Sequence, residues 1–240
     1  MSLELLTIGS CTLDCIIKIK DIMRFELLNN EKVKKYTAIE YSKKLNIEDV
    51  RFFPGGSAAN IASDCAMMNI PSGYIGMIGR DFSAKMCLDD MESRGVDISN
   101  INQTDRDKTA FSVILKTNWG KDRSILAYKG ANDLISPEDI NEDLFKEIQA
   151  FAWTSLTKEN SCKAVEKCIK LTRENGGVVI GARSMSIIKN NKKWAEILIY
   201  KSDIVSLNKE EAQALTNKKD IPTIIKKLID KGLDLVSITN

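Results

Sequence analysis

The amino-acid sequence predicts an α/β fold in which helices cover both faces of a mainly parallel sheet. Short apolar, β-rich runs of strand length alternate with stretches that have the apolar periodicity of a helix. Alternation of this kind is typical of a parallel sheet. Two longer extended segments, 36–53 and 109–128, interrupt it and lack helical periodicity. They could pair into a small separate sheet that serves as a lid, or they could be surface loops, and the residues alone leave both interpretations open.

The expected elements follow in order from the N-terminus. Residues 3–9 form an apolar run that ends at a glycine, and 58–68 carries small residues along one helix face, which allows close packing on a sheet. Both extended segments are expected to be hairpin-like, and 109–128 is expected to turn at 118–121. The complete set is strands at 3–9, 15–19, 74–78, 150–156, 178–181, 204–207 and 233–239, and helices at 58–68, 84–94, 137–149, 162–175, 209–215 and 221–231.

Composition narrows the function. The 240 residues suffice for one large domain, and 35 basic side chains nearly balance 33 acidic ones. A net charge of +2 provides no broad field for nucleic acid or for an anionic membrane, so neither is an expected partner. No apolar run approaches the roughly 20 residues that span a bilayer, and the N-terminus does not have the pattern of a signal peptide. The expected location is the cytoplasm.

Residue types restrict the chemistry further. The six cysteines include no C-x-x-C pair, which favours buried free thiols over disulfides or metal ligands. The chain has no histidine, so histidine-based triads and H-E-x-x-H metal sites are excluded. Proton transfer would need Asp, Glu, Lys, Cys or Tyr.

The strongest local motif is the glycine pair Gly55-Gly56, directly before the helix at 58–68. Glycines let backbone amides approach a ligand, and a helix N-terminus adds partial positive charge. An ordinary tight loop is the alternative. The motif is neither a dinucleotide fingerprint nor a phosphate-binding Walker loop, which argues against a nicotinamide-linked oxidoreductase.

Around this motif the sequence resembles the ribokinase (PfkB) family of carbohydrate kinases, and further matches occur in the family's order along the whole chain. The resemblance implies a ribokinase-like three-layer α/β/α domain over 1–240, with a β-sheet lid formed by about 15–22 and 36–53 together with 109–128. The matching elements are Gly9 to Asp14, Gly55-Gly56 with Asn60, Ile78 to Asp81, Arg123 through Gly130-Ala-Asn132, Asn208 to Glu211 and Leu235 to Thr239.

The resemblance also implies an ATP- and Mg²⁺-dependent phosphotransferase whose acceptor is a hydroxyl of a sugar or nucleoside. Asp14, Gly55, Gly56, Asn60 and Asn132 would bind the acceptor, with Asp14 as a charge-assisted acceptor of two hydroxyl hydrogen bonds. Taken alone, Asp14 would be an ordinary turn aspartate. Edge strands of the lid suggest a homodimer through it.

On the nucleotide side, the resemblance implicates Asn208, Glu211, Thr239 and Arg183. Asn208 and Glu211 are three residues apart at a helix start, so both could face one magnesium ion, usually through water. A helix cap followed by a solvated glutamate is the alternative.

Two departures from the family pattern affect this picture. Gly181 and Arg183 stand where a carboxylate and a polar residue are common, which exchanges negative for positive charge near the nucleotide. The family's G-A-G-D segment, which supplies an anion hole and the catalytic base, is not in residues 1–240. We therefore expect the base beyond Asn240 and an inactive, truncated chain. The alternative is a relative that binds a sugar or nucleoside without catalysis.

Overall fold

The computed structural model describes residues 2–20, 22–29, 32–117, 123–154, 156–182 and 185–239. The chain forms two compact units. The first comprises Met1–Leu13, Pro54–Ala110 and Lys129–Asn240, and the second comprises Asp14–Phe53 and Phe111–Tyr128. Apart from residues 109 and 110, the segments expected to form a lid fall in the second unit.

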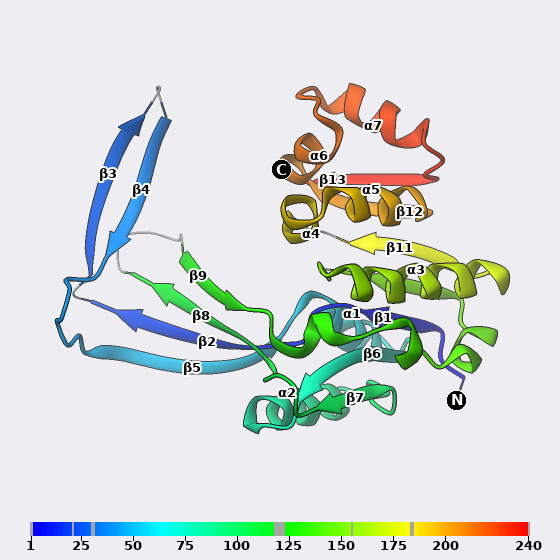
Figure 1. Cartoon of the computed structure of the whole chain (residues 1–240), viewed down its shortest axis with the longest axis horizontal. Helices are drawn as coiled ribbons and strands as arrows, with labels where there is room; N and C mark the ends of the chain where they lie inside the picture. Colours follow the sequence, from blue (N-terminus) through cyan, green and yellow to red (C-terminus); the bar gives the residue numbers. More distant parts are fainter. Residues whose placement is uncertain are drawn as a thin grey trace. The chain divides into compact units, whose positions relative to one another are not determined.

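A seven-stranded sheet forms the centre of the first unit, in the order β13-β12-β11-β10-β1-β6-β7 (Figure 1). Each pair of neighbouring strands runs parallel. The predicted parallel α/β architecture is therefore confirmed. The strands are β1 (Leu5–Ile8), β6 (Ser72–Gly79), β7 (Ile101–Thr104), β10 (Ala150–Trp153), β11 (Val178–Ala182), β12 (Ile204–Asn208) and β13 (Leu235–Thr239).

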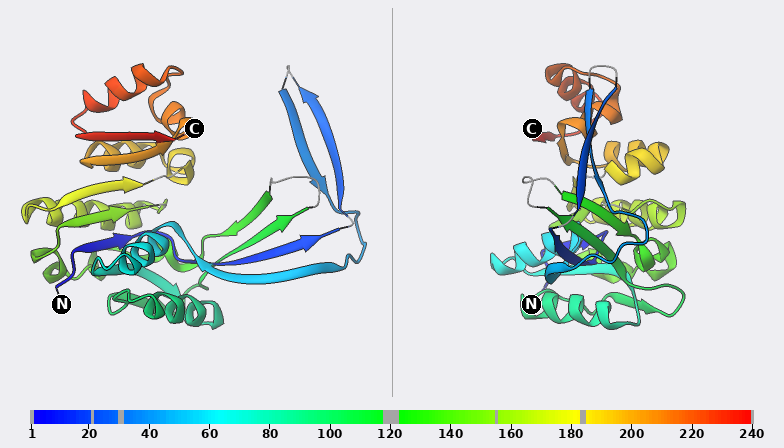
Figure 2. Two further views of the ribbon diagram at one scale, coloured as in Figure 1. Left: turned by 180° about the vertical axis from the view of Figure 1, so that it is seen from behind. Right: turned by 90° about the vertical axis from the view of Figure 1, so that its left-hand side faces the viewer.

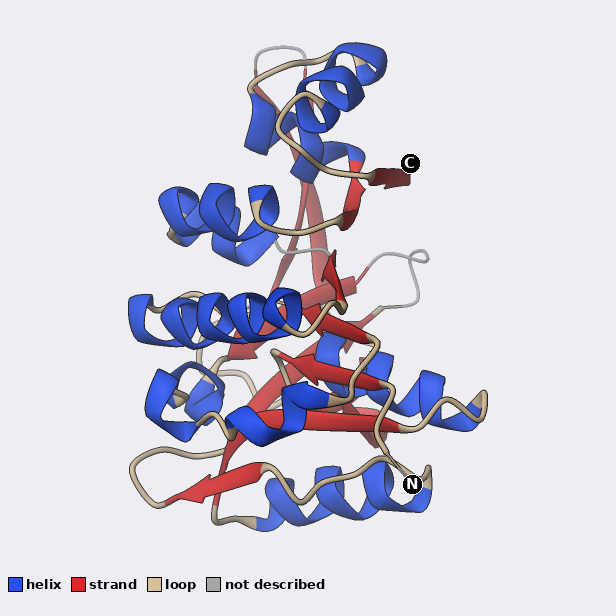
Figure 3. Cartoon of the chain, turned by 90° about the vertical axis from the view of Figure 1, so that its right-hand side faces the viewer, coloured by secondary structure: helices blue, strands red, loops and turns tan. Residues whose placement is uncertain are grey.

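Helices cover both faces of this sheet. The end-on view in Figure 2 places α1 on one side and α3 on the other, and Figure 3 shows helices flanking the strands. α1 packs against β1 and β6, whereas α3 packs against β10 and β11. The α-helices are α1 (Ser57–Met67), α2 (Phe82–Ser93), α3 (Glu159–Glu174), α4 (Met185–Asn190), α5 (Lys192–Tyr200), α6 (Lys209–Thr216) and α7 (Ile221–Ile229).

The main hydrophobic core lies between the sheet and α3. Leu6 and Ile8 of β1 and Val179 of β11 are buried together with Val165 and Ile169 of α3. The two strand residues in β1 are two apart and the two helix residues four apart, the spacings that place side chains on one face of each element. Burial of these apolar side chains holds α3 on the sheet.

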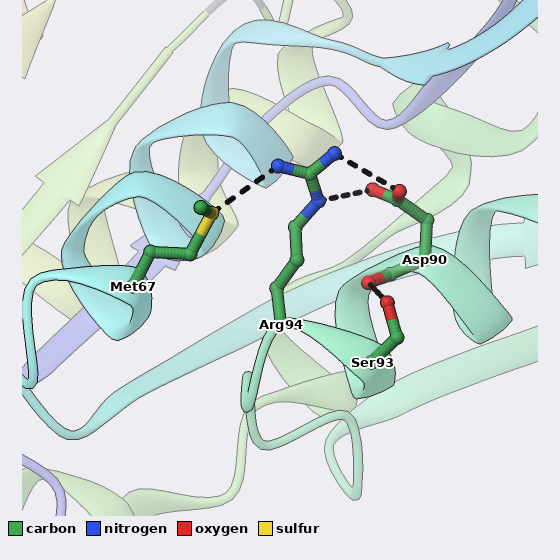
Figure 4. Close-up of polar contacts among 4 residues, drawn as sticks. All are labelled: Met67, Asp90, Ser93 and Arg94. Atoms are coloured by element: carbon green, nitrogen blue, oxygen red, sulfur yellow. Dashed lines mark hydrogen bonds and ion pairs between the residues drawn. The ribbon is translucent and has the colours of Figure 1, made fainter.

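Arg94 links the C-terminal ends of α1 and α2 (Figure 4). Its Nε and Nη2 donate to the two carboxylate oxygens of Asp90 at 2.9 and 3.1 Å, and its Nη1 lies 3.3 Å from Sδ of Met67. Ser93 Oγ also donates to the backbone oxygen of Asp90. The bidentate contact with Asp90 fixes the orientation of the Arg94 guanidinium, which in turn contacts Met67 at the end of α1.

The prediction of a single helix over 137–149 is wrong. Two short 3-10 helices replace it, Pro137–Asp139 and Glu142–Lys146. Ser136 and Asp139 form a capping box at the first, and the side chain of Asn141 caps the second. A second cap at residue 141 starts a new helical turn, because its side chain satisfies the amide of Asp143 from outside the helix.

The second unit contains a four-stranded sheet in the order β5-β2-β8-β9. Its strands are β2 (Thr12–Ile19), β5 (Ile47–Gly55), β8 (Ala110–Lys116) and β9 (Arg123–Tyr128). β8 and β9 pair antiparallel, as expected for 109–128, and the predicted turn at 118–121 lies outside the described residues. β3 (Met23–Asn29) and β4 (Lys32–Ala38) form a separate antiparallel hairpin.

The expectation that 36–53 would pair with itself is also wrong. Its first residues end β4, which pairs with β3, and its last residues belong to β5, which adjoins β2. Tyr36 stacks on Phe25 with ring centroids 5.2 Å apart. Cross-strand aromatic contact of this kind stabilises the β3–β4 pairing.

All six cysteines are free thiols, and Cys65 is the one that is not fully buried. Within the described ranges, no helix combines the length and the apolar character needed to cross a membrane.

Candidate functional site

The carboxyl ends of the parallel strands define the edge of the first unit where a ligand is expected. In parallel α/β sheets, ligands bind outside this edge, because loops and helix N-termini converge there. β1, β10 and β12 end in Ile8, Trp153 and Asn208. Of the residues singled out from the sequence, Glu211 lies in the helix that follows β12, and Gly56 and Asn132 lie against the loop that follows β1.

Gly56 is shaped for close backbone approach. Its φ is +100°, and a Cβ at this position would lie 2.3 Å from the backbone oxygen of Ser10. The amide of Ser57 donates to Oγ of Ser10 at 2.9 Å, and the amide of Ala59 donates to the Ser10 backbone oxygen at 3.3 Å. Gly55 is buried, whereas Asn60 in the first turn of α1 is exposed. The glycine pair thus brings the start of α1 onto the loop that follows β1.

Asn132 contacts the same loop through its side chain. It lies in a 3-10 helix, Gly130–Leu134, and its Oδ1 accepts a hydrogen bond from the amide of Cys11 at 3.2 Å. The residue is only 3% exposed, yet its Nδ2 has no hydrogen-bond partner within the described part of the chain. A buried amide donor without a partner costs free energy, which marks it as a group suited to a ligand or an ordered water.

Thr154 was not identified from the sequence. It follows β10 directly, is fully buried, and its Oγ1 also has no partner among the described residues. A Cβ added at Gly9 would lie 2.2 Å from this oxygen, so the loop after β1 passes immediately beside it. The only available sequence signal was its position as a polar residue at the carboxyl end of a strand.

The Gly-x-Asp turn has a structural role in the first unit. Asp81 caps α2, because its Oδ1 accepts from the amide of Ala84 at 2.9 Å, and its Oδ2 accepts from the amide of Thr109 at 2.8 Å. Burial alone would raise the pKa of Asp81, but these hydrogen bonds outweigh it and hold the pKa below its usual value.

Asp14 belongs to the second unit, whereas Gly55, Gly56, Asn60 and Asn132 belong to the first. It lies in β2 and is half-buried. Burial raises the pKa of the Asp14 carboxyl, and a hydrogen bond from Ser112 opposes the shift.

Asn208 and Glu211 face each other in a capping box at the start of α6. Asn208 Oδ1 accepts from the amide of Glu211 at 2.8 Å, and Glu211 Oε2 accepts from the amide of Asn208 at 2.9 Å. Glu211 Oε1 accepts from the amide of Met185 at 3.1 Å. The side chain of Glu211 is buried at 4% exposure, so the cap is present but the glutamate is not solvated as the alternative interpretation expected.

Thr239 of β13 is the register partner of Asn208 of β12, so these two residues are neighbours at the carboxyl edge. Arg183 lies outside the described residues. Gly181 has a packing reason to lack a side chain, because a Cβ there would lie 3.1 Å from Cζ2 of Trp153 and 3.2 Å from Oγ of Ser202.

Comparison with known proteins agrees with this geometry. The model of the pfkB family of carbohydrate kinases matches residues 5–240, and the chain belongs to this family. The fold is similar to that of a putative ribokinase II from E. coli, with a TM-score of 0.80 and 18% identity over 99% of this chain and 73% of that one. A second structure of that protein, in complex with ATP and Mg²⁺, has a TM-score of 0.77 and 17% identity over 98% of this chain and 72% of that one.

Two relatives are similar in sequence. An ATP-dependent ribose-1-phosphate kinase of Halopiger xanaduensis is 32% identical over 43% of this chain and 34% of its own length. A 5-dehydro-2-deoxygluconokinase of Halalkalibacterium halodurans is 27% identical over 76% of this chain and 58% of its own. The chain therefore spans less than two thirds of the length of either relative.

Proposed function

We propose that the whole protein transfers the γ-phosphoryl group of ATP to a hydroxyl of a sugar or nucleoside. The observation that carries the proposal is the buried, unpartnered amide of Asn132 beside the Gly56 loop, in a chain of the pfkB family. An acceptor hydroxyl would satisfy that amide, and Gly56, which lacks a side chain, lets the start of α1 lie against the neighbouring Ser10 loop.

The acceptor would be held by both hydrogen-bond acceptors and hydrogen-bond donors. Asp14 would accept hydrogen bonds from two hydroxyls, each strengthened by its charge. The backbone amides at Gly55 and Gly56 and the side-chain amides of Asn60 and Asn132 would donate to ring and hydroxyl oxygens. Together they would orient one hydroxyl, and positioning supplies much of the catalysis in phosphoryl transfer.

The nucleotide would lie near Asn208, Glu211, Thr239 and Arg183. Each oxygen of Glu211 accepts one backbone hydrogen bond and retains a lone pair for a water molecule. Carboxylate oxygens of this kind are ligands that suit magnesium held through water. When bound, the metal neutralises phosphate charge, and Arg183 would add a bidentate phosphate partner.

We also propose that the second unit acts as a lid and carries the surface of a homodimer. Met23, Phe25 and Leu27 alternate along one face of β3 and are 57%, 45% and 52% exposed. A lone two-stranded hairpin is marginally stable, so burying this face against a second copy would stabilise it. Light scattering should report a dimer for the parent and a monomer for Phe25→Ser. Equal molecular masses for the parent and Phe25→Ser would refute the assignment of this face as the dimer surface.

The acceptor proposal is tested by binding, because the G-A-G-D segment is not within residues 1–240. Calorimetry with ribose, fructose, 2-keto-3-deoxygluconate and adenosine should detect at least one ligand. Asn132→Ala should raise the dissociation constant of that ligand about tenfold, the factor that corresponds to about 1.4 kcal/mol. Asn190→Ala, at an exposed position at the end of α4, is the matched control and should bind like the parent.

Equal binding by Asn132→Ala and the parent, or no binding by any of the four ligands, would refute the acceptor site. A coupled ADP-release assay on the whole protein, rather than on residues 1–240, separates the two function classes. Binding together with ADP release supports the kinase, whereas binding without release supports a non-catalytic relative.

A further inference from the structure

A groove on the sheet of the second unit has no role in the function proposed so far. It encloses about 380 Å³, and its walls come from β2, β5 and the end of β8. Its lining residues are Ile16 and Lys18 of β2, Asp49, Arg51 and Phe53 of β5, and Lys116 and Thr117.

Positive charge dominates the groove. Lys18, Arg51 and Lys116 line it, and Asp49 is its one acidic lining residue in the described part of the chain. Arg123 adds a further cation, because it is the register partner of Lys116 in the antiparallel β8–β9 pair. Like charges directly opposite each other on a sheet destabilise it, and a bound anion would remove that repulsion.

Part of the positive charge in the groove is available to bind an anion. Nε of Arg51 donates to Asp49 at 2.8 Å, while no acceptor is recorded for its two terminal nitrogens among the described residues. Lys18 pairs with Glu48 at 3.2 Å, but its side chain remains 48% exposed. No carboxylate of the described chain lies within 4.0 Å of the Lys116 ammonium. A guanidinium with two open N–H₂ groups in a groove that two lysines also line suits a phosphate or carboxylate.

The position of Lys18 and Lys116 is not explained by protection of a sheet edge. Proteins often place lysine on edge strands to prevent pairing with another chain. Here β5 and β9 are the edges, whereas β2 and β8, which carry Lys18 and Lys116, are the two inner strands.

The groove shares a strand face with Asp14. Asp14, Ile16 and Lys18 alternate along β2, so their side chains project from one side of the sheet. Four residues of strand span about 13 Å at roughly 3.3 Å per residue, and the long side chains of Lys18 and Arg51 shorten that interval. Phe53, also 47% exposed, provides an apolar wall. A ligand held by hydroxyls at Asp14 would therefore extend toward the cations only if it were longer than a bare pentose ring.

We propose that the groove of Lys18, Arg51 and Lys116 binds a phosphate or carboxylate group of the acceptor, so that the acceptor class is an anionic sugar. The inference rests on the proposed function, because it assigns Asp14 to the hydroxyl end of the same ligand. The shared chemistry is an anion two or more oxygens wide, from a sugar phosphate or from a sugar acid.

Calorimetry with ribose, ribose 5-phosphate, 2-keto-3-deoxygluconate and inorganic phosphate tests the groove. At least one anionic sugar should bind about tenfold or more tightly than ribose, and added salt should reduce the ratio. Arg51→Gln and Lys116→Gln should each remove most of that preference. Lys34→Gln, an exposed cation on the β3–β4 hairpin outside the groove, is the matched control and should retain it. Which anionic sugar is preferred identifies phosphate or carboxylate as the source.

Ribose binding as tightly as both anionic sugars, or a preference unchanged in both groove variants, would overturn the groove while leaving the kinase proposal intact. Inorganic phosphate that binds the parent but not the variants, with no sugar bound at all, would support the anion site and refute the acceptor function. Failure of every ligand, phosphate included, would overturn both.

Discussion

Replacing Asp133 with alanine should strongly destabilise the first unit. The carboxylate is 4% exposed and accepts hydrogen bonds from the amide of Thr157 at 2.6 Å, from Oγ1 of Thr157 at 2.7 Å and from Oγ of Ser161 at 2.8 Å. A fourth, from the amide of Lys158, is longer at 3.3 Å. These contacts join the segment beside Asn132 to the loop that leads from β10 into α3.

The size of the effect follows from which donors lose their only partner. Ser161 Oγ also lies 2.9 Å from the backbone oxygen of Lys158, so it keeps a partner in the variant. The two Thr157 groups lose their only partner, whereas solvent can replace the longer bond from the amide of exposed Lys158. A hydrogen bond to a charged group contributes about 1.5–3 kcal/mol, so two of them give a loss of about 3–6 kcal/mol. Domain stabilities are about 5–15 kcal/mol, which makes this a large fraction of the total.

Urea unfolding followed by tryptophan fluorescence measures the change, with Trp153 buried at the end of β10 as a nearby reporter. The urea concentration at the unfolding midpoint should fall, while the slope of the unfolding free energy against urea concentration stays constant. Asp143→Ala is the matched control, because Asp143 is exposed and pairs only with Lys146 at the surface. Equal midpoints for Asp133→Ala and Asp143→Ala would refute the assignment of Asp133 as a structural anchor.

Three further substitutions probe the site. Gly56→Ala forces a Cβ to 2.3 Å from a backbone oxygen and should abolish acceptor binding in calorimetry, whereas Gly95→Ala, also at positive φ but in open space, should bind normally. Glu211→Gln replaces one carboxylate oxygen with an amide N–H₂ that faces a backbone N–H donor. Urea unfolding should show that the free energy of unfolding falls by about 1–3 kcal/mol, whereas Glu210→Gln, at an exposed position, should leave it unchanged. The lowered pKa of Asp81 contributes stability above about pH 4, which is lost on acidification through the folded pKa. Asp81→Asn should therefore flatten the fall in unfolding midpoint between about pH 5 and pH 3, and identical curves would contradict the linkage.

Local pattern was sufficient to predict most of the first unit. The alternation of apolar strand-length runs with helix-period stripes predicted six of its seven strands as parallel neighbours, and the small residues of 58–68 predicted α1. The glycine pair before α1 was likewise visible, because a positive φ and close backbone approach require glycine whatever surrounds it.

Short helices were harder to predict. α4 and α5 together cover little more than four turns and meet at Asn191, and helices of this length are not stable alone. Burial of Ile187 and Leu198 in the main core holds them in place. The false helix at 137–149 had the opposite cause, since two local caps divided a segment whose apolar spacing suited one helix.

Taken by itself, the sequence determined most strands and the longer helices of the first unit, although not β7, α4 or α5, and it singled out Gly56, Asn132 and Asn208. Tertiary structure alone decided that β5 pairs with β2, that the amide of Asn132 is left without a partner, and that Lys18, Arg51 and Lys116 line one groove. The physical reason is the separation along the sequence of the residues that interact. Periodicity and backbone conformation are set by residues a few positions apart. Strand pairing and burial bring together residues more than a hundred positions apart, such as Cys11 and Asn132 at 121, and no local pattern encodes which of them meet.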